Sequence, residues 1–143
     1  MALPARLLGM ARNGRSLRIW LVWVVLVHLG LSLVHGAAHA QANVPLSRAG
    51  TLFVFIVILA GPLVGLALTW PAERLGSWLV ALTMAGSLVF GLVNHFVLDS
   101  ADHVTHVQPE WRALFATTAV LLALTELLGS GLAIRVLRAR TSS

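Results

Sequence analysis

The stretch TLFVFIVILAGPLVGLAL, residues 51–68, contains no charged side chain. The stretch SWLVALTMAGSLVFGLV, residues 77–93, is equally free of charge. A soluble chain of 143 residues would cover its core with charged groups, which runs of this kind do not provide. With 58% apolar and only 10% charged residues, the chain is predicted to lie in a lipid bilayer.

Four apolar segments are long enough to cross ~30 Å of hydrocarbon as helices. We expect spans near residues 19–39, 50–69, 76–98 and 112–134. The connections between them are short, which makes consecutive helices antiparallel neighbours. The sequence therefore predicts an all-α, integral membrane four-helix bundle with up-down topology, in a single transmembrane domain covering residues 1–143.

The basic residues are all arginine, and they gather mainly at the two chain ends and in the second connection. Because short arginine-rich loops and tails stay cytoplasmic, we expect both termini in the cytoplasm and the protein in the cell (inner) membrane. These arginines follow the span boundaries, so the lipid bilayer is the expected partner and nucleic acid is not. Whether the chain also forms a homodimer or joins a larger membrane complex stays open.

The first 40 residues permit a second interpretation. An arginine-rich start, an apolar run and the tripeptide Ala38-His39-Ala40 are also typical of a cleaved signal peptide. The run is long for such a signal and contains His28 and His35, which favours a retained first span. Cleavage would leave three spans and discard half of the histidine cluster discussed below.

Two spans carry polar residues at the spacing i, i+4, i+7 and i+11, which keeps them on one helical face. On the first span these residues are His28, Ser32, His35 and His39. The third span repeats the spacing if its helix continues about two turns beyond the membrane boundary. Its residues are His95, Asp99, Asp102 and His106.

The up-down topology brings the outer ends of these two spans to the same depth. Imidazole and carboxylate groups four residues apart on a helix can bind one metal ion, and a second helix can complete the ligand set. We therefore predict a metal site on the outer, periplasmic face. The expected ligands are His35, His39, His95, Asp99 and His103, with Asp102 and His106 as supporting or alternative ligands.

The chain has no cysteine, which excludes thiolate ligands and disulfides. Nitrogen and oxygen ligands suit a transition metal ion such as Zn²⁺, Cu²⁺ or Fe²⁺. A b-type haem electron carrier, with His35 and His95 as axial ligands, is an alternative because bis-histidine ligation occurs in four-helix bundles. A non-catalytic accessory subunit of a larger membrane complex is another, and whether the chain is an enzyme stays open.

His28 and Glu126 lie well inside their spans, where an ionisable group needs a partner. Counted from the outer ends of their spans, the two positions differ in depth by about one helical turn. We predict a buried polar pair. It would either stabilise the bundle or pass protons inward from the outer site.

Overall fold

The computed structural model describes the backbone of residues 5–141 and the side chains of residues 14–139. Every regular element within this part of the chain is helical. The elements are α1 (Ala5–Gln41), α2 (Arg48–Phe53), η1 (Val54–Ala60), α3 (Gly61–Leu68), α4 (Glu73–Leu92), η2 (Val93–Val97) and α5 (Pro109–Thr141). Of these, η1 and η2 are π-helical turns that continue the neighbouring α-helices.

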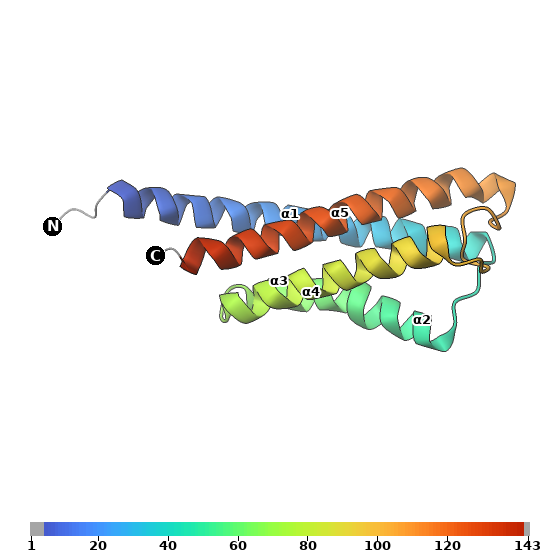
Figure 1. Cartoon of the computed structure of the whole chain (residues 1–143), viewed down its shortest axis with the longest axis horizontal. Helices are drawn as coiled ribbons and strands as arrows, with labels where there is room; N and C mark the ends of the chain where they lie inside the picture. Colours follow the sequence, from blue (N-terminus) through green and yellow to red (C-terminus); the bar gives the residue numbers. More distant parts are fainter. Residues whose placement is uncertain (1–4, 142–143) are drawn as a thin grey trace.

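Four helical segments are long and apolar enough to cross a membrane: Gly14–Gln41, Arg48–Leu68, Glu73–Val97 and Pro109–Ala139. The second comprises α2, η1 and α3, and the third comprises α4 and η2. Figure 1 shows that successive segments run in alternate directions, so that both chain ends lie at one end of the bundle. The predicted all-α architecture with four apolar spans is confirmed.

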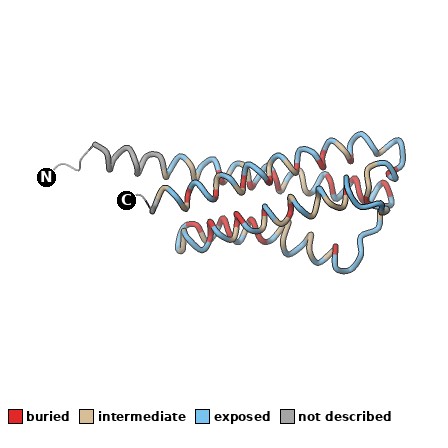
Figure 2. The backbone as a smooth tube through the Cα atoms, viewed as in Figure 1, coloured by how far each residue is buried: buried red, intermediate tan, exposed pale blue. Residues whose placement is uncertain are grey.

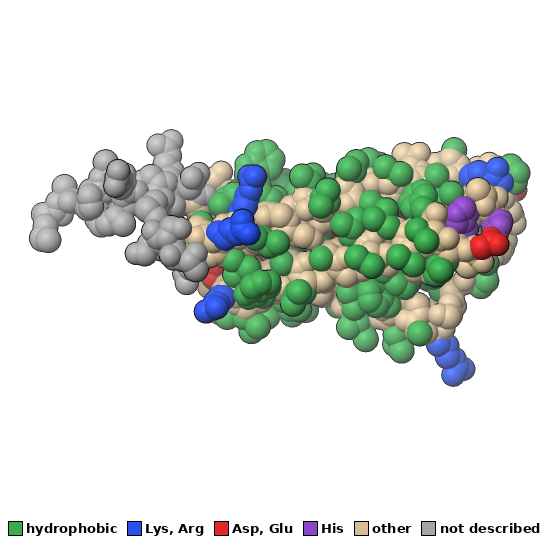
Figure 3. Space-filling view, viewed as in Figure 1, with side chains coloured by type: hydrophobic (Ala, Val, Ile, Leu, Met, Phe, Trp, Pro, Cys, Tyr) green, Lys and Arg blue, Asp and Glu red, His purple; other side chains and the backbone are tan. Residues whose placement is uncertain are grey.

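The outward surfaces of these helices are apolar. Leu52, Phe55 and Val89 each leave about three fifths of their surface exposed. Exposed residues run along much of every helix in Figure 2, and hydrophobic side chains cover the middle of the face seen in Figure 3. Because so much exposed apolar surface is unfavourable in water, this surface fits contact with lipid tails.

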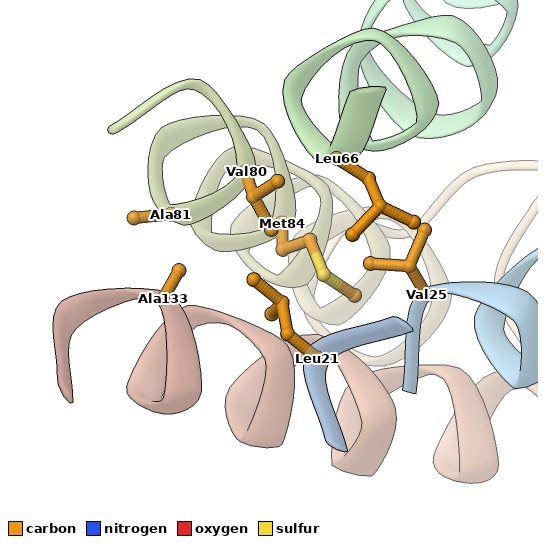
Figure 4. Close-up of a cluster of buried hydrophobic side chains, with 7 residues drawn as sticks. All are labelled: Leu21, Val25, Leu66, Val80, Ala81, Met84 and Ala133. Carbon is orange, nitrogen blue, oxygen red and sulfur yellow. The ribbon is translucent and has the colours of Figure 1, made fainter. Parts of the chain in front are cut away.

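A hydrophobic core holds the helices together in the half of the bundle nearer the termini. It contains residues of α1, α3, α4 and α5, and Figure 4 shows the Met84 side chain reaching among Leu21, Val25 and Leu66. Small residues allow α3 and α4 to approach closely, because a Cβ atom at Gly76 would overlap the backbone of α3. The full set of buried core residues is Leu21, Val25, Leu66, Val80, Ala81, Met84 and Ala133.

A side-chain hydrogen bond links α1 to the second span. The Nε2 atom of His28 on α1 lies 3.2 Å from the backbone carbonyl oxygen of Ile58 in η1 and donates its proton there, because a carbonyl oxygen can only accept. The π-helical turn η1 leads directly into Pro62, which has no N–H group to donate to the preceding turn. His28 therefore ties α1 to the irregular middle part of the second span.

Candidate metal centre

Three histidines meet at the end of the bundle that lies opposite the chain termini. His35 and His39 come from α1, one helical turn apart, and His95 comes from the π-helical turn η2. One ring nitrogen from each lies within 4.8 Å of the others. All three side chains are buried, with exposed fractions of 7%, 9% and 7%. We call these three residues the histidine cluster.

The Nε2 atoms of His35 and His95 lie 3.2 Å apart. The Nδ1 atom of His35 donates to the Thr118 hydroxyl oxygen at 2.8 Å, because the Thr118 proton is itself donated to the Leu114 carbonyl at 2.8 Å. The Nδ1 atom of His95 lies 3.1 Å from the backbone carbonyl of Asp102, which can only accept. Both rings therefore carry their proton on Nδ1, and each Nε2 atom holds a lone pair.

Two lone pairs that face each other at 3.2 Å repel unless a cation lies between them. With bonds of 2.0–2.1 Å and a tetrahedral angle, two imidazole nitrogens on one Zn²⁺ ion would stand about 3.3–3.4 Å apart. The observed separation is close to that value. The spacing of the two rings is compatible with one shared cation, either a proton or a metal ion.

Asp102 supports two of the three rings. Its Oδ1 atom lies 3.3 Å from Nε2 of His39 and 3.4 Å from Nδ1 of His95. Burial raises the pKa of the Asp102 carboxyl group, but its interactions with the rings of His95, His39 and His35 outweigh burial. The pKa therefore lies below its ordinary value, and the carboxylate places a negative charge beside both rings.

Asp102 reaches the cluster from a loop and not from a helix. The helix ends at Val97, Leu98 is extended with ψ at 130°, and the carbonyl of His95 accepts a hydrogen bond from the backbone of Val104 at 3.0 Å. The chain thus folds back over the helix end. The expectation that the third span continues two turns further is wrong, because the loop satisfies the last carbonyls in place of another helical turn.

The structure separates the remaining candidates from the cluster. The Asp99 side chain is 92% exposed and lies 3.2 Å from Nε2 of His106. The ring of His103 is bonded to the Thr105 hydroxyl at 2.7 Å, near the surface of the loop. Of the predicted ligands, His35, His39 and His95 come together with Asp102 beside them. Asp99, His103 and His106 do not join them.

Two residues of α5 belong to the site and were absent from the sequence-based prediction. Phe115 is fully buried and packs its ring against His35 and His39 at centroid distances of 4.7 Å each. Thr118 fixes the tautomer of His35. Their only signal in the sequence is a spacing of three residues, which places them on one face of the fourth span.

The geometry does not fit a bis-histidine haem. Axial nitrogens on opposite sides of one iron would stand about 4 Å apart with bonds near 2 Å, whereas the His35 and His95 nitrogens are 3.2 Å apart. The rings of His39 and Phe115 pack on His35 at 4.8 Å and 4.7 Å. They occupy the space beside the His35 ring that a porphyrin would need.

A cavity of about 360 Å³ adjoins the histidine cluster. His35, His39, His95 and Asp102 all line it, and Glu126 lines it as well. Phe115 covers the cluster from the α5 side and is not part of the cavity wall. The cluster is therefore closed on one side and open to this cavity on the other.

His28 and Glu126 are neighbours inside the bundle. The Nδ1 atom of His28 lies 3.9 Å from Oε1 of Glu126, and the residues are only 1% and 4% exposed. This separation is longer than a hydrogen bond. Because Nε2 of His28 donates its proton to Ile58, Nδ1 faces Glu126 as an acceptor.

No protein-family model, curated protein or solved structure shows significant similarity to this chain.

Proposed function

We propose that this protein binds a divalent transition metal ion within the membrane, with His35, His39 and His95 as its ligands. The observation that carries the proposal is the opposed pair of Nε2 lone pairs on His35 and His95, 3.2 Å apart, with a third imidazole beside them. Neutral imidazoles that converge on one point form a typical ligand set for such ions.

A proton shared by His35 and His95 would also relieve the repulsion between the two lone pairs. It would, however, engage only two of the three rings. A metal ion engages all three and leaves each ring its other nitrogen for a supporting hydrogen bond. The Thr118 hydroxyl and the Asp102 carbonyl provide that support for His35 and His95, which is the arrangement usually found behind metal-bound histidines, and the Asp102 carboxylate lies 3.3 Å from Nε2 of His39.

Zn²⁺ fits this ligand set best among the candidates, because the nitrogen spacing is close to the tetrahedral value and no sulfur ligand is present. Cu²⁺ and Fe²⁺ also accept imidazole ligands. Three histidines with a free fourth position are the ligand arrangement of catalytic zinc sites. The distribution of arginine supports an orientation with both termini in the cytoplasm, which would put the site on the periplasmic side of the inner membrane.

Elemental analysis of the full chain, purified in mild detergent, tests the proposal directly. We expect a stoichiometric amount of one transition metal, and the visible spectrum will separate colourless Zn²⁺ from Cu²⁺. His103→Ala and His106→Ala are matched controls, because both residues are loop histidines outside the cluster. They should retain the metal. A metal-free wild-type protein that also takes up none on titration would refute the proposal.

Replacing Thr118 by valine should weaken metal binding without removing a ligand. The change keeps the shape of the side chain but deletes the oxygen that accepts the proton of His35 Nδ1. Loss of such a support typically lowers metal affinity by about 10–100-fold. A competition titration against a chelator measures the affinity.

The control is Thr125→Val on the same helix, because the Thr125 hydroxyl bonds only to the Leu122 carbonyl. This variant should bind metal as the wild type does. Equal affinities in the two valine variants would mean that Thr118 does not orient His35.

A further inference from the structure

We infer that the fourth ligand of the proposed metal ion is the oxygen head group of a lipid-soluble molecule that occupies the adjoining cavity. The inference rests on the proposed metal site and goes one step further, because it names the chemistry of what meets the metal there. Three observations support it: the lining of the cavity, the position of its opening, and the charge at its polar end.

The cavity has a polar end and mostly apolar walls. The histidine cluster and Asp102 form the polar end, while η1 and α5 contribute mainly hydrocarbon and aromatic side chains, with Glu126 as the acidic exception. Its volume of about 360 Å³ lies at the small end of the usual range for ligand pockets. Apolar side chains of the wall include Leu46, Val54, Phe55, Ile58, Leu59 and Phe90.

The cavity opens toward the lipid. Leu33 of α1 and Phe55 of η1 line it, although their exposed fractions are 60% and 62%, so both lie at its rim. Both residues belong to membrane-spanning segments. Figure 1 shows α2, which leads directly into η1, diverging from the rest of the bundle. A molecule dissolved in the bilayer can therefore enter between α1 and the second span.

The loop side of the cluster is closed. Ala38, Ala42, Val107 and Phe115 form a second buried core there. Arg112 holds the loop in place by donating from Nε and Nη2 to the carbonyl of Val107. A water-soluble ligand would have to pass this layer, whereas a lipid-soluble one would not.

The charge at the polar end favours an anionic oxygen. Three neutral imidazoles leave a divalent ion with its full charge, and the carboxylate of Asp102, the acidic group beside the rings, offsets half of it. One carboxylate oxygen on the metal ion would neutralise the remainder. A phenolate oxygen would do the same once the quinol hydroxyl has passed its proton to Glu126, the other carboxyl group that lines the cavity. Ala119 and Glu126 both line the cavity and are seven residues apart on α5, hence about 10 Å apart along the helix. That length accommodates a ring or a short hydrocarbon chain behind the oxygen.

Two membrane constituents share this chemistry, a fatty acid and a quinol. The test uses the full chain in lipid nanodiscs loaded with Co²⁺, whose visible spectrum changes when a fourth ligand binds. The probes are dodecanoate and a decyl-substituted hydroquinone. Acetate supplies the head group without a chain, and dodecane supplies a chain without the head group. Whichever long-chain probe changes the spectrum at the lower concentration identifies the class of ligand.

Gly36→Leu fills the cavity beside the cluster, because Gly36 lines the cavity and a Cβ atom there meets nothing within 4 Å. We expect it to raise the concentration of probe needed for half-saturation by about tenfold or more while Co²⁺ content stays unchanged. Gly30→Leu is the matched control. Gly30 lies on the same helix with equally open surroundings but does not line the cavity, so its probe response should equal that of the wild type.

The outcomes separate the two proposals. Co²⁺ binding with no spectral response to either long-chain probe overturns the inference and leaves the metal site standing. Acetate acting at the same concentration as dodecanoate also overturns it, because the site would then be open to water. A wild-type protein that takes up no Co²⁺ defeats the metal site and this inference together.

Discussion

His35→Ala and His95→Ala are each expected to reduce the metal content of the purified protein to background. Each change deletes one of three ligands and removes one half of the opposed Nε2 pair. The affinity should fall by more than the ~100-fold that marks the upper end for losing a supporting hydrogen bond. Elemental analysis and chelator competition both measure the effect.

A fold control is needed because both histidines are buried. The thermal unfolding of each variant in detergent should resemble that of the metal-free wild type, and the helical circular dichroism should be unchanged. Wild-type metal content in both alanine variants would show that the ion, if present, sits elsewhere. If His35 and His95 share a proton and not a metal ion, the wild-type protein will bind no metal.

Gly76→Ala is expected to destabilise the bundle although it adds only one methyl group. The new Cβ atom would overlap backbone atoms of Gly65, Leu68 and Thr69 in or next to α3. Backbone cannot rotate out of the way as a side chain can, so α3 and α4 would have to separate. The cost of such overpacking is about 1–3 kcal/mol in the free energy of unfolding.

Unfolding in mixed detergent micelles measures this change. The matched control is Gly131→Ala on α5, where a Cβ atom meets nothing within 4 Å. That substitution should stabilise its helix by roughly 0.5–1 kcal/mol, because alanine loses less conformational freedom than glycine. Opposite signs for the two variants are the expected result. A stabilising effect at Gly76 would contradict the close backbone contact.

The four long apolar helices could be predicted from the sequence because hydrophobicity over some twenty residues is a local property. Residues His35 and His39 were placed together by helical periodicity alone, and the up-down topology brought His95 to the same end, because the first and third spans run in the same direction. These inferences need no knowledge of loops. They succeed because every backbone group in a bilayer has to be bonded internally, which restricts the chain to helices.

The sequence could not predict how the chain leaves the third span. Continuing the helix would have placed Asp99 one turn beyond His95, whereas the observed turn at Leu98 sends Asp102 back to the rings. Leu98 is neither proline nor glycine, so its residue type does not predict the end of the helix. The partnership of His28 with Ile58 was equally hidden, because it depends on a backbone carbonyl of a different helix.

The side chains of the site come from α1, η2, the loop after η2 and α5, so they are synthesised at different times. When the first span enters the membrane, its histidines have none of these partners, because Thr118 and Phe115 are translated some eighty residues later. Until then the imidazoles of His35 and His39 depend on water or the insertion machinery for their hydrogen bonds. We therefore expect metal loading to be the last step in maturation, after the fourth span has docked.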